Sequence, residues 1–262
     1  MPTENSVVMA MEGRVATIRL NRPEKLNAVS LQLYRQLSGS LADVGDRTDV
    51  RAVVLTGEGR AFCVGADLEA HGRNPGDRAS RAAYVAAAQS VAGTIRSLRI
   101  PVVAAVNGHA IGAGLELALA CDLGVVAEDA KLRFPEIGLG TFVGGGATAN
   151  LVRRVGLARA KELVLLCPMF SGAEAVEMGL LNRATPAADV FPTALELAAE
   201  LAGRAPLPMA LAKDLLGRAG GLDPDAVLDL EAEALLLCME TADWREGIEA
   251  FRDKRDPRFT GE

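Results

Sequence analysis

The sequence lacks the features that mark several common protein classes. Its 262 residues carry a net charge of -6 and a pI near 5.2, and Lys and Arg form no run. Nucleic acid binding needs cations clustered over one face, so this charge pattern argues against a nucleic acid partner. Charged residues interrupt every apolar stretch before it reaches the roughly 18 residues that a membrane helix requires. We therefore expect no membrane association.

Cysteines are few, and we expect no secretory leader. The four cysteines stand singly, without CxxC or CxxxC spacing: Cys63, Cys121, Cys167 and Cys238. This spacing fits neither a zinc cluster nor a disulfide scaffold, so we expect reduced core cysteines and no metal. The segment Met1 to Asn5 lacks the positive stretch and following apolar stretch of a secretory signal. These absences predict a cytoplasmic protein.

Apolar residues make up half of the chain, which is enough for a full core in one domain or in one domain with an appendage. A hairpin is expected where two β-branched runs meet at Glu12-Gly13, and Ser30 is expected to cap a helix that ends near Gly45. The order strand, glycine-rich turn, helix then occurs twice, and it predicts an α/β fold with parallel strands. Further elements are expected as strands at 51–56, 102–106, 123–127 and 131–134, and as helices at 79–98 and 115–121 and from Gly146 towards Arg154.

The pattern becomes almost wholly helical from Asp189 onward, with prolines near the expected helix starts. A capping box is predicted before this region, at Ser171 to Glu174. We place a domain boundary near residue 200. A region of roughly 60 residues is marginal alone, so residues 201–262 are expected to pack on the body formed by residues 1–200 or on another subunit.

Two glutamates, Glu116 and Glu136, lie beside glycine-rich or turn-forming stretches in the middle of the chain. Two carboxyls near an electrophile can divide acid and base roles when their surroundings separate their pKa values, so the pair predicts proton-transfer chemistry. A plainer interpretation is that Glu116 lies in the first turn of a helix, where the dipole favours it, and that Glu136 is a solvated loop carboxylate.

The glycine turns Gly65-Ala66-Asp67 and Gly112-Ala113-Gly114 also allow more than one interpretation. They could present backbone N-H donors to a ligand, or they could serve as tight connections between elements that bind nothing. A dinucleotide-binding turn is disfavoured because Leu117 stands where the third glycine belongs and because the turn lies deep in the chain.

An ordered set of motifs resembles the crotonase (enoyl-CoA hydratase/isomerase) superfamily. The set runs along the chain as Asn21-Arg-Pro-Glu-Lys-Leu-Asn-Ala28, Gly59 to Leu68, Pro101 to Gly108, Gly112 to Asp122, Pro135-Glu136 and Trp244 to Arg255. The resemblance implies a spiral of ββα units with a C-terminal helical region for trimerisation and active-site cover. It also implies acyl-CoA thioester substrates, trimers or dimers of trimers, and no cofactor beyond the coenzyme A of the substrate.

The resemblance also assigns roles to residues of this sequence. It places Glu116 and Glu136 in the catalytic positions of the hydratases and the Ala66 and Ala113 N-H groups in an oxyanion hole. The implied reaction adds water to a trans-2-enoyl-CoA, with Glu116 activating the water and Glu136 exchanging the proton at the α carbon, as in lyases of fatty acid metabolism. Contacts to coenzyme A are expected from Arg22, Lys25, Ala28, Ala66, Asp67, Leu68, Phe251 and Lys254, the last two from the same or from a neighbouring subunit.

Departures from the family pattern leave the substrate open. Glu69 replaces a frequent Lys, and Thr141 to Gly146 and Ala149-Asn150 differ from the usual wall of the acyl pocket. The polar stretch from His71 to Ser80 is expected to form a lid, and His109 to support the oxyanion turn. The alternatives to hydration are isomerisation, dehydration of an unusual acyl-CoA, thioester hydrolysis, and a catalytically silent acyl-CoA-binding subunit.

Overall fold

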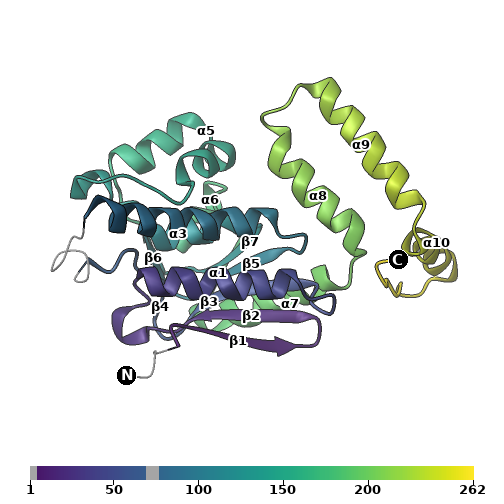
Figure 1. Cartoon of the computed structure of the whole chain (residues 1–262), viewed down its shortest axis with the longest axis horizontal. Helices are drawn as coiled ribbons and strands as arrows, with labels where there is room; N and C mark the ends of the chain where they lie inside the picture. The colour runs from purple at the N-terminus through teal and green to yellow at the C-terminus, as the bar shows by residue number, and fades with distance from the viewer. Residues whose placement is uncertain (1–4, 69–76) are drawn as a thin grey trace.

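A computed structural model describes residues 5–68 and 77–262, and its strands form two sheets (Figure 1). The large sheet has the order β1 (Val7–Glu12), β2 (Val15–Leu20), β3 (Ala52–Gly57), β5 (Val102–Val106), β7 (Leu123–Ala127) and β10 (Arg183–Thr185). The small sheet has the order β4 (Ala61–Cys63), β6 (His109–Ile111), β8 (Lys131–Arg133) and β9 (Phe170–Ser171). Along the chain, strands from β3 to β8 alternate between the two sheets.

This alternation builds three ββα units. The pairs β3–β4, β5–β6 and β7–β8 each place their first strand in the large sheet and their second in the small sheet. The helices that follow these pairs are α3 (Arg78–Ser97), α4 (Ala113–Ala120) and α5 (Ala147–Leu165). Strands β2, β3, β5, β7 and β10 pair in parallel, and only the β1–β2 hairpin of this sheet is antiparallel. The expected α/β fold of ββα units is therefore confirmed.

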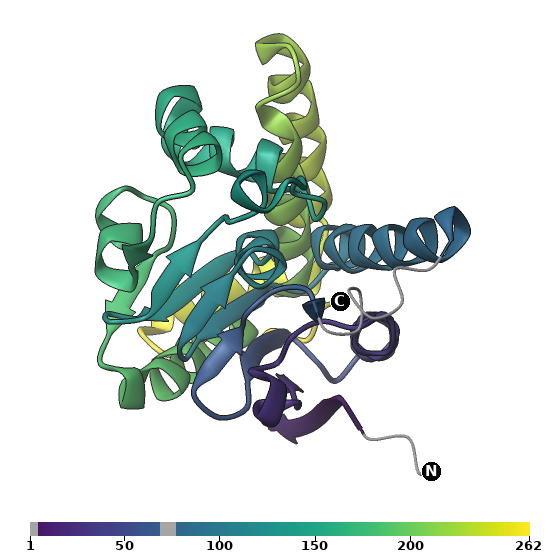
Figure 2. The ribbon, with the colours of Figure 1, turned by 90° about the vertical axis from the view of Figure 1, so that its left-hand side faces the viewer.

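Burial on both faces explains the composition of the central strands. Every residue of β3 and β5 is buried, as in parallel strands covered on both sides. In Figure 2 the strands lie between α7 (Val190–Ala202) and the pair formed by α1 (Leu31–Gly45) and α3. The expected cap of α1 is confirmed, because the Ser30 hydroxyl accepts a hydrogen bond from Leu33 N at 3.2 Å.

The sequence did not reveal most of the small sheet. The stretches that contain β4 and β6 looked like glycine-rich turns, yet each holds a strand of three residues before its turn. Helix α4 begins at Ala113, two residues earlier than expected, and α5 is interrupted at Gly156, which has φ 75° and ψ 165°. The capping box of Ser171 and Glu174 is present at the start of α6 (Gly172–Glu177).

The C-terminal helices stand to one side of the sheets in Figure 1. They are α8 (Pro206–Ala219), α9 (Pro224–Met239) and α10 (Ala242–Asp253), and α7 before them packs on β3, β5 and β7. The expected boundary at residue 200 thus falls within the last turn of α7. Helix α8 is held to the body by Lys213, whose Nζ lies 2.8 Å from Asp122 Oδ2 and donates to the carbonyl of Ile95 at 2.8 Å.

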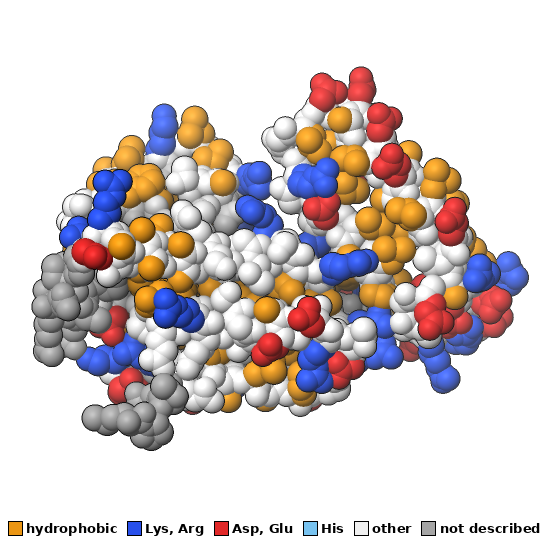
Figure 3. Space-filling model, in the orientation of Figure 1, with side chains coloured by type: hydrophobic (Ala, Val, Ile, Leu, Met, Phe, Trp, Pro, Cys, Tyr) orange, Lys and Arg blue, Asp and Glu red, His pale blue; other side chains and the backbone are white. Residues whose placement is uncertain are grey.

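The apolar character of the helices, the state of the cysteines and the exposed leucines all bear on function. Within the described residues no helix has the length and apolar character needed to cross a membrane. Cys63, Cys121 and Cys167 are buried and Cys238 is half-buried, all as free thiols. Figure 3 shows apolar side chains among the charged ones on α8 and α9, where Leu216 and Leu236 are exposed.

Candidate active site

Three neighbouring strand ends of the small sheet converge on one place. Strands β4, β6 and β8 pair in parallel, so the residues that follow their carboxyl ends meet at one edge, where parallel sheets commonly bind ligands. Ala66 follows β4, Ala113 follows β6 and Glu136 follows β8. A Cβ placed on Gly65 would lie 3.6 Å from Ala113 N. The structure therefore brings together residues that lie about 50 and 20 positions apart in the sequence.

The backbone amides of Ala66 and Ala113 lie at this edge, and neither has an acceptor in the described part of the chain. Val29 N donates to Gly65 O at 2.8 Å and Asp67 N donates to Val29 O at 3.1 Å. Because successive N-H groups of an extended chain point to opposite sides, the amide of Ala66 points away from Val29. Ala113 is the first residue of α4, where an N-H has no acceptor within the helix.

Glu116 lies in the first turn of α4 and is 5% exposed. Its carboxylate accepts hydrogen bonds from the N-H groups of Gly144 at 3.2 Å and Gly145 at 2.5 Å. Burial raises the pKa of Glu116, although these hydrogen bonds act in the opposite direction. The segment Thr141 to Gly146, which was expected to form part of the wall of the acyl pocket, thus holds the carboxylate of Glu116.

Glu136 is buried as well, at 9% exposed, so its interpretation as a solvated loop carboxylate is wrong. A Cβ on Gly112 would lie 2.5 Å from Oε1 of Glu136, which places this carboxyl beside the start of α4. Its Oε2 is buried and has no hydrogen-bond partner in the described residues. Burial raises the pKa of Glu136, and the negative charge of Glu116 raises it further.

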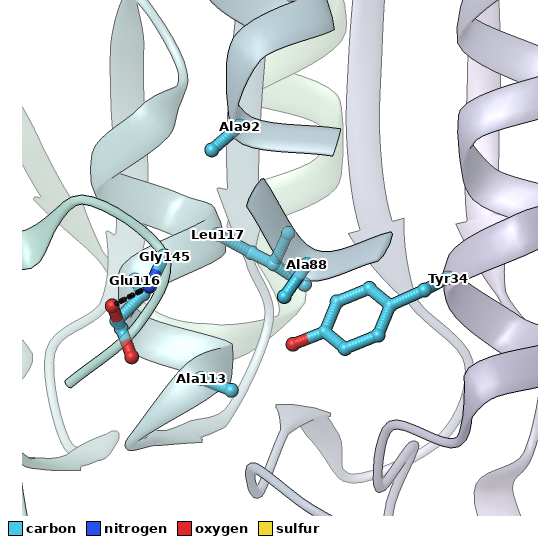
Figure 4. A pocket seen from close by; sticks show the side chains of 7 residues that line it. All are labelled: Tyr34, Ala88, Ala92, Ala113, Glu116, Leu117 and Gly145. Carbon is cyan, nitrogen blue, oxygen red and sulfur yellow. Dashed lines mark hydrogen bonds between the residues drawn. The ribbon is translucent and has the colours of Figure 1, made fainter. Parts of the chain in front are cut away.

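A small cavity lies against Glu116 (Figure 4). Its volume of about 10 Å³ is room for a single water. Helices α1, α3 and α4 contribute most of its lining, which consists of Tyr34, Ala88, Ala92, Ala113, Glu116, Leu117 and Gly145. Tyr34 was missed in the sequence because its place in an apolar helical stripe is typical of an ordinary core residue.

Arg22 and Asn27 fasten the loop that carries Ala66. The Arg22 guanidinium donates to Ala28 O at 2.7 Å and, through Nη2, to Asp67 Oδ2 at 3.1 Å. The Asn27 amide donates to Ala61 O at 2.8 Å, and its Oδ1 accepts from Arg22 N at 2.9 Å. Arg22 was expected to contact coenzyme A, and in the structure two of its donors are used inside the protein.

The other expected coenzyme A contacts fall into two groups. Lys25 and Leu68 are exposed near the Arg22 loop, whereas Ala28 is buried. Phe251 and Lys254 belong to the end of α10, which Figure 1 shows at the opposite end of the molecule from the start of α3. A single chain therefore does not bring these two residues to the strand ends that carry Glu136.

The remaining expectations concern the loops and metals. Residues 71–76 of the expected lid, His71 among them, lie outside the described residues, and Asp77 caps α3 by accepting from Ser80 N at 2.8 Å. His109 supports the small sheet, because its Nδ1 accepts from Lys131 N at 3.2 Å. The described residues contain no group of His, Cys, Asp and Glu that could hold a metal ion.

Known proteins resemble this chain over nearly its whole length. Residues 10–262 match the family model described as enoyl-CoA hydratase/isomerase. The short-chain-enoyl-CoA hydratase of Clostridium acetobutylicum is 33% identical over 96% of this chain and 96% of its own. The 2,3-dehydroadipyl-CoA hydratase of Escherichia coli is 34% identical over 98% and 99%.

Solved structures agree with these sequence relationships. The crystal structure of an enoyl-CoA hydratase from Bacillus anthracis matches with a TM-score of 0.94 at 34% identity, over 98% of this chain and 100% of that one. The match includes the two-sheet core and the C-terminal helices, since it covers almost every residue. The chain therefore belongs to the enoyl-CoA hydratase/isomerase, or crotonase, family.

Proposed function

We propose that this protein is an enoyl-CoA hydratase, which adds water reversibly to a trans-2-enoyl-CoA to give a 3-hydroxyacyl-CoA. One observation carries the proposal: two buried carboxyls, Glu116 and Glu136, lie at the strand ends where the amides of Ala66 and Ala113 have no acceptor among the described residues. Relatives named as hydratases support it.

The two amides would act on the thioester carbonyl. Addition at the β carbon moves negative charge onto the carbonyl oxygen, and two fixed N-H donors aimed at that oxygen stabilise the transition state. Loss of one such donor costs about 3 kcal/mol in other enzymes. Ala113 begins α4, so the positive end of the helix dipole would face the same oxygen.

The two carboxyls would divide the proton transfers. Ionised Glu116 accepts a proton from water while the water oxygen bonds to the β carbon, and the carbon-carbon π electrons move towards the carbonyl. Protonated Glu136 then gives its proton to the α carbon, and exchange with solvent restores both carboxyls. Burial raises the pKa of both carboxyls; at Glu116 the hydrogen bonds from Gly144 and Gly145 act in the opposite direction and support its charged form, whereas at Glu136 the negative charge of Glu116 raises the pKa further.

Coenzyme A binding and assembly complete the proposal. Lys25, Leu68 and the turn at Ala66-Asp67 would contact the coenzyme, and Phe251 and Lys254 would reach it from a neighbouring copy in a trimer or a dimer of trimers. The distance between α10 and the site in one chain supports this assignment to a neighbour. No cofactor is needed beyond the coenzyme A that the substrate carries, and a cytoplasmic location suits such a substrate.

A direct assay tests the proposal. Crotonyl-CoA is incubated with the enzyme in ¹⁸O-labelled water, and the product mass is measured. Incorporation of one labelled oxygen into a 3-hydroxyacyl-CoA, with loss of the enoyl absorbance, is the expected result. Absence of labelled hydroxyacyl product from enoyl thioesters of every chain length would contradict it.

Double-bond isomerisation is the second candidate, and the observation that favours it is that Glu136 Oε2 has no hydrogen-bond partner among the described residues. A 3-enoyl-CoA can become a 2-enoyl-CoA when one carboxyl carries a proton from the α to the γ carbon, so isomerisation does not require Glu116 to activate water. Conversion of 3-hexenoyl-CoA to 2-hexenoyl-CoA without incorporation of labelled oxygen would identify this reaction.

A further inference from the structure

Tyr34 closes one side of the cavity that borders Glu116. In Figure 4 its phenol reaches in from α1, and the hydroxyl lies between Ala88 and Ala113, facing α4. The carboxylate of Glu116 lies on the other side of the same space. A volume of about 10 Å³ leaves room for a group the size of one water between them.

The position of the Tyr34 ring is fixed by its surroundings. The side chain is 3% exposed, and its ring meets that of Tyr84 edge to face, with centroids 5.4 Å apart and an interplanar angle of 63°. Aromatic pairs in this geometry are favourable contacts. A longer ligand would therefore have to displace two packed rings to extend past Tyr34.

An acyl chain would enter this cavity after its reacting carbons. With the thioester carbonyl at the Ala113 amide and the β carbon at Glu116, the next carbon would face the space in front of Tyr34. Ala92 and Leu117 border that space with apolar atoms, and the Tyr34 hydroxyl borders it with a polar one. Further methylenes would meet the ring, which is packed against Tyr84 and leaves no room for them.

We propose that Tyr34 is a specificity-determining residue that restricts the acyl group to short chains. The carbonyl, α and β carbons plus one group of about the size of a water amount to about four carbons. The proposal rests on the proposed function for the orientation of the substrate. It goes beyond that function because it names the substrate class, short-chain enoyl thioesters, and the side chain that selects it.

Binding of unreactive thioesters tests the inference without any need for turnover. Dissociation constants for butyryl-CoA and octanoyl-CoA are measured by isothermal titration calorimetry. The wild type is expected to bind octanoyl-CoA about tenfold more weakly than butyryl-CoA, as a closed pocket discriminates between ligands that differ in length. Tyr34→Ala is expected to remove this difference, and Tyr34→Phe, which keeps the ring, is expected to retain it.

A second set of variants works in the opposite direction and avoids truncation of a buried ring. Ala92→Val adds atoms to the cavity wall and is expected to weaken butyryl-CoA binding about tenfold. Ala86→Val is the matched control, because Ala86 lies on the same helix α3, is exposed and does not border the cavity. Its affinity for butyryl-CoA should equal that of the wild type.

The results distinguish a failure of the length limit at Tyr34 from a failure of the hydratase assignment. Equal affinity of the wild type for both thioesters, or an unchanged preference in Tyr34→Ala together with no effect of Ala92→Val, would overturn the role of Tyr34. That result would leave hydration of crotonyl-CoA unaffected. Conversely, selective binding of butyryl-CoA without hydration of any enoyl thioester would support the length limit and contradict the hydratase assignment.

Discussion

The carboxylate of Glu116 lies against the backbone of Gly145 and accepts a hydrogen bond from the Gly145 N-H at 2.5 Å. A Cβ at Gly145 would come within 3.1 Å of Glu116 Oε2, closer than most real Cβ contacts. The loop before α5 therefore both holds the carboxylate and limits the space around it. This contact explains why a buried glutamate can keep a fixed orientation beside the cavity.

Replacing either glutamate by its amide should remove most hydration while the fold persists. Glu116→Gln and Glu136→Gln are each expected to lower kcat by about 10²- to 10⁴-fold, the usual contribution of general acid or base catalysis. Steady-state rates with crotonyl-CoA and circular dichroism spectra check this. Glu128→Gln is the control, since Glu128 is exposed. Near-normal turnover of either catalytic variant would refute the assigned roles.

The raised pKa of Glu136 predicts how stability depends on pH. A carboxyl whose pKa is higher in the folded state binds more protons there than in the unfolded state. The free energy of unfolding therefore falls as pH rises from the ordinary carboxyl pKa of 4.5 through the raised value. The Glu136→Gln variant has no carboxyl to ionise at this position and so keeps this part of its stability at high pH. Its thermal midpoint should therefore exceed that of the wild type at pH 8. The difference should shrink as pH falls towards 4, and an equal offset at both pH values would contradict this explanation.

Gly112 tests the coupling between the turn that carries Ala113 and the carboxyl of Glu136. Gly112 has φ +52°, and its added Cβ would lie 2.5 Å from Glu136 Oε1. Gly112→Ala should therefore displace the carboxyl and lower kcat by about 10²-fold, as small misplacements of catalytic groups do. Gly13→Ala is the control, because Gly13 has φ +57° and no atom within 4 Å of its Cβ. Both variants should lose stability, but a similar loss of kcat in both would exclude the proposed contact.

Arg22 distinguishes a positioning role from a coenzyme A contact. Arg22→Ala would leave Asp67 without one partner and Ala28 O without its donor, which costs about 1–3 kcal/mol for each buried group left unsatisfied. We expect a lower thermal midpoint together with a lower kcat, because the loop that carries Ala66 loses its fastening. A raised KM for crotonyl-CoA with kcat and thermal midpoint unchanged would instead indicate direct binding of the coenzyme.

The exposed leucines of α9 predict self-association. Leu228, Leu235, Leu236 and Leu237 are each at least 51% exposed, and large apolar patches usually mark interfaces. Light scattering should give the mass of a trimer or hexamer for the wild type and a smaller mass for Leu236→Asp. Asp229→Asn, also on α9, is the control for a change in charge, and its mass should match that of the wild type. A monomeric wild type would contradict the prediction.

The sequence predicted the large sheet and its helices because their signals are local. Runs of buried apolar residues marked β3 and β5, and side-chain caps at Ser30 and Ser171 marked helix starts that the structure contains. The glutamates were found because they adjoin glycine-rich turns.

The rest depends on contacts between distant segments, which no local pattern reports. Strands β4 and β6 have three residues each, too few for a clear alternation of polar and apolar residues. The contact of Glu116 with Gly145 joins residues 29 positions apart. Arg22 was expected to contact coenzyme A, because nothing near it in the sequence reveals its bond to Asp67, 45 positions away.

The order of the ββα units has a consequence for folding kinetics. Ala66, Ala113 and Glu136 follow strands from three successive units, so the edge at which we propose catalysis is complete only after the third unit has docked on the second. Parallel pairing across helical crossovers closes long loops and is slow to form. During refolding, the recovery of turnover should therefore lag behind the recovery of helical circular dichroism.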